Sequence, residues 1–342
     1  MNLEKKEYNS LDILKFVLSI FVLVIHSEID KTIISPLLRI AVPIFFIVSS
    51  YLFFSKVSSL NEEKQRIFAL KRLVKRNIML YLFWVVVQLP IIIFGHHFHI
   101  NFFTKGIWET LKIIILGQAC TGSWYIIALV IGSVLIYFAS KKLSAGWLVV
   151  LTLPLYIMCC FTTNYRGMFI ADSLLNQFNT MYENVTQCAF NTSLPGGLFW
   201  IAVGNFLARK PIHIKTVALK ISSVCLWMLV AVERYYIVKF GWQILDDCYF
   251  TLILLCPVIF LLVKQNSFTF KSSFRFREIS TLIYVMHGSC GRVVGFIMKM
   301  APGYVQHEII KVGITIVVVL IVSIVFLGLR DRFKFKVLKY AC

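Results

Sequence analysis

The chain has 342 residues, of which 59% are hydrophobic and only 15% are charged, and its mean hydropathy is +0.80. A composition this apolar excludes an ordinary soluble domain and indicates a polytopic membrane protein. The formal net charge of +19 would suggest nucleic-acid binding in a soluble protein, but in a membrane protein the charges must first be divided between the two sides of the bilayer.

Ten apolar segments, each near the length of a spanning helix, follow one another along the chain. They lie at about 11–27, 35–55, 77–95, 122–140, 146–162, 195–208, 216–237, 245–263, 279–298 and 306–328. No polar block between them is large enough for a separate soluble domain, so residues 1–342 are interpreted as one membrane domain. The predicted fold class is all-α, a polytopic integral membrane protein with about ten transmembrane helices. The residues flanking the first segment predict no cleavable signal peptide.

Basic residues predict the orientation of these helices. With the N-terminus inside, six basic clusters fall on the cytoplasmic side: Lys5 and Lys6, the loop 56–76, Lys141 and Lys142, residues 209–215, residues 264–277 and the tail 330–339. Cytoplasmic loops of membrane proteins carry an excess of Lys and Arg, so both termini are predicted to be cytoplasmic. The same bias explains the net charge without a nucleic-acid partner.

The connecting segments suggest further structure. Apolar residues among the charges of the loop 56–76 predict a helix lying at the membrane surface, and residues 108–116 suit a half-inserted helix. The longest polar connection, 163–194, falls outside. The histidines of HHFH at 96–99 are interpreted as interfacial, because their spacing does not place three rings around one ion, and no metal is expected. The cysteines form no CxxC pair, and one disulfide near the outer face is possible.

Polar side chains line one face of the first predicted span, LDILKFVLSIFVLVIH. Four of them follow i, i+3, i+7 and i+14: Asp12, Lys15, Ser19 and His26. Polar groups within a span almost always face a protein interior or a water-filled cavity. His26 lies roughly 21 Å along the axis from Asp12 at 1.5 Å per residue. The stripe therefore predicts a path from the cytoplasmic end toward the outer half, although an interfacial ion pair and an interfacial histidine remain the alternative.

Other cations and aromatic residues extend the candidate site. Arg72, Lys75 and Arg76 occupy adjoining turns before the third span, where they could bind a polyphosphate or simply set orientation. His287 and Arg292 fall within a later span and could line a cavity. Trp124, in GSWYIIAL, is placed like a residue of an interfacial aromatic belt.

Five segments, taken in order, resemble the membrane acyltransferase-3 family, the integral membrane O-acyltransferases of bacterial envelopes. They are the first span, PIFFIVSSYLF (43–53), KRLVKRNIMLYLFW (71–84), GSWYIIALVIG (122–132) and STLIYVMHG (280–288). The resemblance implies a protein of the bacterial cytoplasmic membrane that transfers an acyl group, usually acetyl from cytoplasmic acetyl-CoA, to sugars or other acceptors at the outer face.

By this resemblance His26 is the essential histidine, Asp12 and Lys15 match the acid and the arginine of the first-span motif, and Arg76 matches the arginine before the third span. The chain also departs from the family pattern. Lys15 replaces an arginine, Ser50 a glycine and Leu80 a proline, while Leu73 stands where the family has a second arginine and Arg72 is one position away. Lysine keeps the charge of arginine but loses its bidentate geometry.

The predicted site therefore has three parts, in which acetyl-CoA is the acyl donor and an envelope sugar or polysaccharide is the acceptor. The catalytic group comprises His26, Asp12 and Lys15; the donor-binding group Arg76, Arg72 and Lys75; and the possible cavity His287, Arg292 and Trp124. A small-solute transporter, for example for serine, or an exopolysaccharide exporter built on the same membrane domain is the alternative. A purely structural scaffold would leave His287 and Arg292 unexplained.

Overall fold

The computed structural model describes residues 9–29, 34–94, 106–266, 275–300, 307–333 and 342. These residues form α-helices and short 3-10 turns and no strands, which confirms the all-α class. The helices are α1 (Asn9–Ile25), α2 (Ser35–Leu38), α3 (Ala41–Ser58), α4 (Glu63–Phe94), α5 (Gly106–Ile115), α6 (Trp124–Ala139), α7 (Ala145–Thr162), α8 (Leu174–Thr186), α9 (Leu194–Arg209), α10 (Thr216–Lys239), α11 (Leu252–Gln265), α12 (Phe276–Lys299) and α13 (Glu308–Phe333).

Five stretches within the described residues are long and apolar enough to cross a bilayer, as expected of a multi-pass membrane protein. They are Ser35–Ser58, which joins α2 and α3, and helices α7, α10, α12 and α13. Helices α1, α6, α9 and α11 coincide with predicted spans but have 17, 16, 16 and 14 residues. Ten spans and cytoplasmic termini therefore stay predictions.

Helix α4 differs from the expectation for the loop 56–76. A separate surface helix was expected there, whereas Glu63–Phe94 is one continuous helix of 32 residues. No glycine or proline interrupts it before Pro90, so its basic first turns and its apolar later turns share one axis. Glu63 ties its start to the end of α6 by accepting hydrogen bonds from Lys141 (2.5 Å) and Tyr137 (2.9 Å). The Lys141 ammonium lowers the pKa of this carboxyl.

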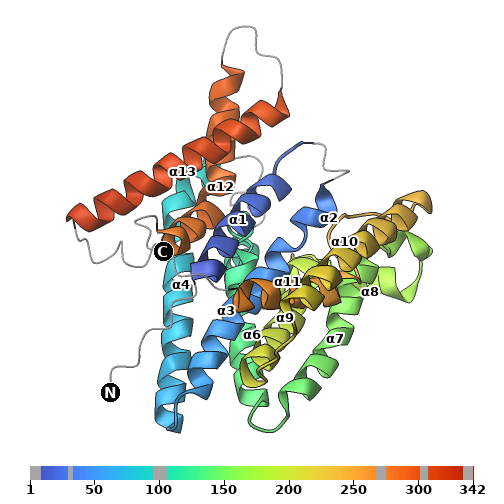
Figure 1. The fold of residues 1–342 in the computed structure, drawn as a ribbon. Helices are drawn as coiled ribbons and strands as arrows, with labels where there is room; N and C mark the ends of the chain where they lie inside the picture. Colours follow the sequence, from blue (N-terminus) through green and yellow to red (C-terminus); the bar gives the residue numbers. More distant parts are fainter. Residues whose placement is uncertain (1–8, 30–33, 95–105, 267–274, 301–306, 334–341) are drawn as a thin grey trace.

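The core of the protein is centred on α3, which packs closely against α9 (Figure 1). A Cβ atom at Gly204 would lie 1.9 Å from the hydroxyl oxygen of Ser50 and 2.7 Å from the carbonyl oxygen of Ile47. Only glycine fits at this approach. Ser50, on α3, is fully buried at this contact. The glycine that allows α3 and α9 to approach is therefore Gly204 on α9, and not residue 50 on α3.

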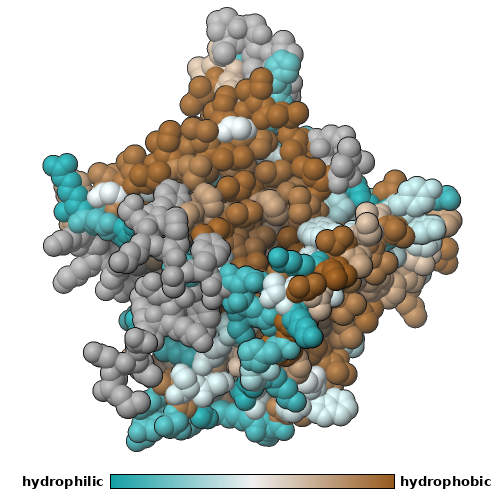
Figure 2. Space-filling model, in the orientation of Figure 1, coloured by the Kyte–Doolittle hydropathy of each residue, from teal (hydrophilic) through white to brown (hydrophobic). Residues whose placement is uncertain are grey.

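Helices α12 and α13 form a hairpin that leans away from the helices around α3 (Figure 1). Figure 2 shows hydrophobic surface over this hairpin and hydrophilic surface at the opposite end, where α3 turns into α4 and α6 into α7. Large apolar side chains are exposed along α13 and α10, as expected of helices that face lipid. Helix α1 lies along α12 and joins the hairpin to the rest of the protein.

The segments outside the spans are partly ordered by short helices. A helix, α5, lies where a half-inserted helix was expected, and its insertion stays a prediction. The connection 163–194 contains α8 and two 3-10 turns, Arg166–Met168 and Phe190–Thr192. All nine cysteines are free thiols, including Cys120, Cys188 and Cys248 near the predicted outer face. HHFH at 96–99 lies outside the described residues.

Candidate functional site

The polar residues of α1 lie where α1 packs on α12 and α3. Ser19 is fully buried and donates a hydrogen bond to the carbonyl of Phe16, one turn earlier. Asp12 and Lys15 are half-buried, and the Lys15 ammonium lies 5.9 Å from the ring centroid of Phe45 on α3. His26 follows the last residue of α1 and is exposed. The stripe therefore runs between α1 and its neighbours, although its role stays a prediction.

Three cations from three helices gather at the start of this stripe. Lys15 of α1 lies within electrostatic reach of Arg76 of α4 and Arg277 of α12, with Asp12 as the nearby acid. Arg76 and Arg277 also act on each other. Neither arginine forms an ion pair with a carboxylate within the described part of the chain. We call Lys15, Arg76 and Arg277 the open cation cluster; like charges held together in this way favour binding of an anion.

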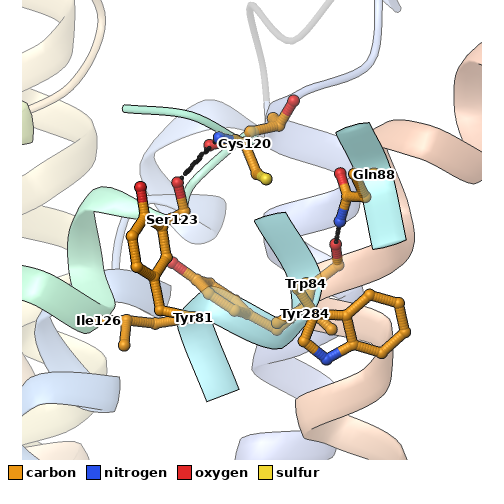
Figure 3. Close-up of a pocket in the computed structure, with 9 residues that line it drawn as sticks. Tyr81, Trp84, Gln88, Cys120, Ser123, Ile126 and Tyr284 are labelled. Carbon is orange, nitrogen blue, oxygen red and sulfur yellow. Dashed lines mark hydrogen bonds between the residues drawn. The ribbon is translucent and has the colours of Figure 1, made fainter. Parts of the chain in front are cut away.

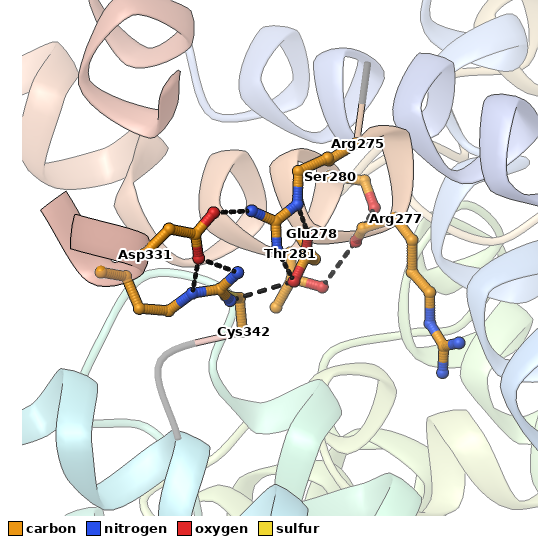
Figure 4. A network of polar contacts seen from close by, with 8 residues as sticks. Arg275, Arg277, Glu278, Ser280, Thr281, Asp331 and Cys342 are labelled. Carbon is orange, nitrogen blue, oxygen red and sulfur yellow. Dashed lines mark hydrogen bonds and ion pairs between the residues drawn. The ribbon is translucent and has the colours of Figure 1, made fainter. Parts of the chain in front are cut away.

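A neighbouring group of charges is arranged in the opposite way. Arg275 pairs with Glu278 and with Asp331 of α13, the latter at 2.5 Å, while Arg330 pairs with Glu278 at 3.0 Å and with Asp331 at 3.1 Å. These four residues are called the paired network, and they join the start of α12 to the end of α13. Figure 4 shows the guanidinium of Arg277 pointing away from this network, without a contact to its carboxylates.

The other predicted donor-binding residues lie differently. Arg72 is exposed and acts electrostatically on Arg76, while Lys75 is exposed and is not among the charges that act most strongly on Lys15 or Arg76. Leu73 is half-buried against the core. An arginine at position 73 would point into this packing, so the shift to Arg72 keeps the cation on the exposed face of α4.

Two histidines meet at the other end of α1. The imidazole of His26 stacks on that of His287 in α12, with ring centroids 5.1 Å apart and ring planes at 28°. His287 is 2% exposed, and its Nδ1 lies 2.7 Å from the carbonyl oxygen of Tyr284. A carbonyl only accepts hydrogen bonds, so Nδ1 carries the proton and Nε2 presents a lone pair. That Nε2 is buried with no hydrogen-bond partner among the described residues. We call His26 and His287 the histidine pair.

A glycine-rich turn between α5 and α6 presses against this pair. Gly117 and Gly122 have φ of +81° and +75°, which side-chain-bearing residues rarely adopt. The Tyr284 hydroxyl donates a hydrogen bond to the Gly122 carbonyl. A Cβ atom at Gly122 would lie 3.8 Å from Cε1 of His287, and one at Gly288 would lie 2.6 Å from Oγ1 of Thr121. Glycines on both sides thus allow the turn to approach α12.

The turn also lines a small cavity, shown in Figure 3. Its walls include Tyr81, Gln88, Cys120 and Tyr284, and its volume of about 10 Å³ is near the minimum needed to hold one water molecule. Gln88 donates to the Val285 carbonyl (2.7 Å) and accepts from Ser289 (2.8 Å), so it joins α4 to α12. The cavity is too small for an acyl donor, and we assign it a packing role.

The remaining predicted residues lie around the histidine pair or on α6. Arg292 is half-buried, donates to the Gly288 carbonyl at 3.2 Å and lies within electrostatic reach of His287. Trp124 begins α6 and packs on Phe46 with ring centroids 5.8 Å apart. Beyond His26, Glu28 accepts a hydrogen bond from Lys311 of α13 at 2.7 Å, which lowers the pKa of the Glu28 carboxyl.

The two clusters lie at opposite ends of the helix pair α1 and α12. Lys15 and Arg277 approach at one end and His26 and His287 at the other, so the two helices run in the same direction. Eleven residues separate Lys15 from His26, a rise of about 17 Å, and ten separate Arg277 from His287, a rise of about 15 Å. The helix pair therefore carries cations at one end and imidazoles at the other.

Comparison with known families identifies the family of the chain. The family model described as an acyltransferase domain matches residues 8–328, nearly the whole chain. The chain belongs to the acyltransferase-3 family. The resemblance to this family that five short segments indicated is therefore confirmed. The open cation cluster and the histidine pair both fall within the matched residues.

Named relatives of this acyltransferase-3 protein carry a different description. Two amino-acid racemases of Enterococcus faecalis are 22% identical over 219 residues (61% of this chain, 29% of the relative) and 20% identical over 348 aligned positions (96% and 47%). The chain thus spans less than half the length of these relatives. No solved structure matches it.

Sequence reasoning missed Arg277 as a neighbour of Lys15 and Arg76. It was grouped with Arg275 among the basic residues that set orientation, although only Arg275 has an acid three residues later, Glu278. The available signal was its place ten residues before His287, nearly the spacing of Lys15 and His26. Tyr284 was part of a quoted motif, but its bond to Gly122 joins residues 162 positions apart and leaves no local pattern.

Proposed function

We propose that the protein transfers an acyl group, acetyl from acetyl-CoA, from the cytoplasm to a hydroxyl of an envelope sugar or polysaccharide, and that it does so in a bacterial cytoplasmic membrane. The single observation that carries the proposal is the placement of a cation cluster and a histidine pair at opposite ends of α1 and α12, within a chain of the acyltransferase-3 family. Cations at one end suit the phosphates of a CoA donor. Imidazoles at the other end suit proton transfer from a hydroxyl.

The donor would bind at the open cation cluster. CoA carries a pyrophosphate and a 3′-phosphate, and Arg76 and Arg277 can each hold phosphate oxygens in bidentate geometry. Lys15 adds a point charge deeper in the path, where the family usually has arginine. Asp12, beside Lys15, limits the repulsion between the cations and orients the lysine. The pantetheine arm would then follow α1 toward His26.

The chemistry would take place at His26. Its imidazole accepts the proton of the acceptor hydroxyl while the hydroxyl oxygen attacks the thioester carbonyl. The carbon–sulfur bond breaks, the acyl group is left on the acceptor oxygen, and the proton passes to the CoA thiolate. Atoms and charges balance without a metal or another co-reactant. In a variant of this step the acyl group is transferred twice, first from CoA to the His26 imidazole and then from His26 to the acceptor hydroxyl.

The experiment is transfer of label from acetyl-CoA carrying a ¹⁴C-acetyl group to a panel of sugars and oligosaccharides, catalysed by the purified protein in lipid vesicles. We expect labelled product from the parent and a loss of at least about 10²-fold in His26→Ala, the usual contribution of a general base. His26 is exposed just beyond the end of α1, so the substitution should leave folding intact. His213→Ala, in the segment between α9 and α10, is the matched control. Full transfer by a well-folded His26→Ala protein would exclude His26 as base or carrier.

A transporter for a small solute is the second candidate. The relatives named amino-acid racemases raise it, because their name points to an amino acid as ligand and this chain, which covers less than half of their length, need not carry the racemase chemistry. Lys15, which replaces the family arginine, fits a changed ligand at the same place. The two functions separate by the donor: a transporter accumulates an amino acid such as ¹⁴C-serine in vesicles and binds no acetyl-CoA. Uptake without donor binding would favour transport.

A further inference from the structure

His287 is a buried titratable group that the proposed reaction does not use. Its side chain is enclosed between α12, the end of α1 and the Gly122 turn. The bond from Nδ1–H to the Tyr284 carbonyl determines its tautomer, and its Nε2 has no hydrogen-bond partner among the described residues. A buried polar atom without a partner is unfavourable, so Nε2 does not stabilise the fold and the role of this ring is sought in its other contacts.

The face of the His287 ring, rather than its edge, makes the contact with the proposed catalytic residue. The two imidazoles lie 5.1 Å apart with planes at 28°, an offset stack and not a hydrogen bond. His26 projects from the first residue beyond α1 and is exposed, whereas His287 sits within α12 and is buried. The contact therefore joins an exposed ring to an enclosed one.

The contacts around His287 hold its ring in one position. Its Nδ1 bond holds the ring against α12, and the Gly122 turn lies beside Cε1, where a Cβ atom at Gly122 would come within 3.8 Å. Tyr284 is held in turn by its bond to the Gly122 carbonyl and by ring contacts with Phe45 (5.8 Å) and Tyr125 (5.5 Å). Helices α3, α6 and α12 thus fix the position of the ring on which His26 rests.

We propose that His287 is a positioning residue for His26: its ring is a fixed platform that sets the plane of the His26 imidazole and so directs a His26 nitrogen toward the acceptor hydroxyl. The proposal rests on the proposed function of His26 as base. Catalysis by a base requires its nitrogen at hydrogen-bond distance from the hydroxyl and in the right direction. A stacking partner that fixes the ring plane removes the rotation that would turn the nitrogen away.

Two substitutions separate a platform from a second base. His287→Phe and His287→Leu both remove the ring nitrogens and both place an apolar side chain in a buried site, but only Phe keeps a flat ring face. For a platform, we expect His287→Phe to lose about fivefold in kcat, from the missing Nδ1 bond, and His287→Leu to lose about 10²-fold, the effect of a small misplacement of a reacting group. The KM for acetyl-CoA should stay unchanged in both, because the open cation cluster is about 15 Å away along α12.

The assay is ¹⁴C-acetyl transfer by purified protein in vesicles, with the sugar that the parent acetylates. Equal and large losses in both variants, with donor KM intact, would mean that a His287 nitrogen takes part in the reaction, and the platform would be rejected. Full activity of the Leu variant would also reject it. A merely structural role would instead raise the KM for the donor and lower the yield of folded protein in both.

A second measurement tests the stack without any transfer activity. The protein is labelled with ¹³C at Cε1 of its seven histidines and studied by NMR. The signal of His26 is the one that is absent from the spectrum of His26→Gln. We expect a nuclear Overhauser contact between the His26 and His287 rings in the parent, and a ring-current shift of the His26 signal that persists in His287→Phe and disappears in His287→Leu. If the parent transfers no label but shows this contact, the proposed function fails while the stack stands. Absence of both the contact and the shift would overturn the platform whatever the activity.

Discussion

Arg275 and Arg277 stand two residues apart at the start of α12, yet they belong to two differently organised groups of charges. Arg275 is part of the paired network, in which two arginines share the carboxylates of Glu278 and Asp331 (Figure 4). Arg277 is part of the open cation cluster with Lys15 and Arg76, where Asp12 acts on Lys15 and Glu278 acts on Arg76. The first group is complete within the protein and joins two helices. The second carries excess positive charge, which a bound anion would compensate.

The comparison predicts that substitutions in the two groups have opposite readouts. In the open cation cluster they should change donor binding and leave stability alone. In the paired network they should change stability and leave donor binding alone. Binding is measured as the Kd of acetyl-CoA for the purified protein, and stability as the Tm of the same preparation.

The largest effect is expected for Arg76→Ala. Loss of a charged hydrogen-bond donor to phosphate should weaken acetyl-CoA binding by about 1.5 to 3 kcal/mol. Arg76→Lys should restore only part of it, because lysine keeps the charge but loses the fork. The Tm should not fall, since Arg76 has no carboxylate partner within the described residues. If the Kd is unchanged in both variants, Arg76 does not bind the donor, and these cations only set the orientation of the protein in the membrane.

A smaller effect is expected for Arg277→Gln. Its guanidinium is exposed, so removing it should weaken acetyl-CoA binding by about 1 kcal/mol, near fivefold. The Tm should stay the same or rise, because the substitution removes repulsion from Lys15 and Arg76. Its matched partner is Arg275→Gln, two residues away, which should lower the Tm and leave the Kd unchanged. If Arg275→Gln instead weakens acetyl-CoA binding and Arg277→Gln lowers the Tm, the two groups have been assigned the wrong roles.

The paired network is tested most directly by Glu278→Gln. Both arginines of the network lose a carboxylate partner, but the site is partly exposed, so the loss of stability should be about 1 kcal/mol or less. Acetyl-CoA binding should be unchanged or slightly tighter, because Glu278 also acts electrostatically on Arg76. Weaker binding at normal Tm would place Glu278 in the donor site and contradict the comparison.

These differences also show how far the sequence could predict the site. Apolar length and periodicity predict the helices well, and the polar stripe of α1 follows from spacing on a single helix. The pair of Arg275 with Glu278 is local, but its second partner, Asp331, lies 56 residues later, and the pairing of His26 with His287 joins residues 261 positions apart. Helical periodicity contains no information on such contacts. The continuous α4 was missed for a related reason: charged turns resemble a surface helix until the chain is seen to continue without a break.

The smallest effect is expected for Lys75→Ala, which separates a defined cluster from general surface charge. Lys75 is the sequence neighbour of Arg76, but about 100° of helix rotation divides their side chains, and Lys75 is not among the charges that act most strongly on Lys15 or Arg76. At about 0.15 M salt the Debye length is about 8 Å, so an exposed lysine outside the cluster is largely screened from a bound phosphate. The Kd of acetyl-CoA should therefore change by less than about twofold. If Lys75→Ala weakens acetyl-CoA binding as much as Arg277→Gln does, the whole basic surface of α4 attracts the donor. The open cation cluster would then not be a distinct binding site.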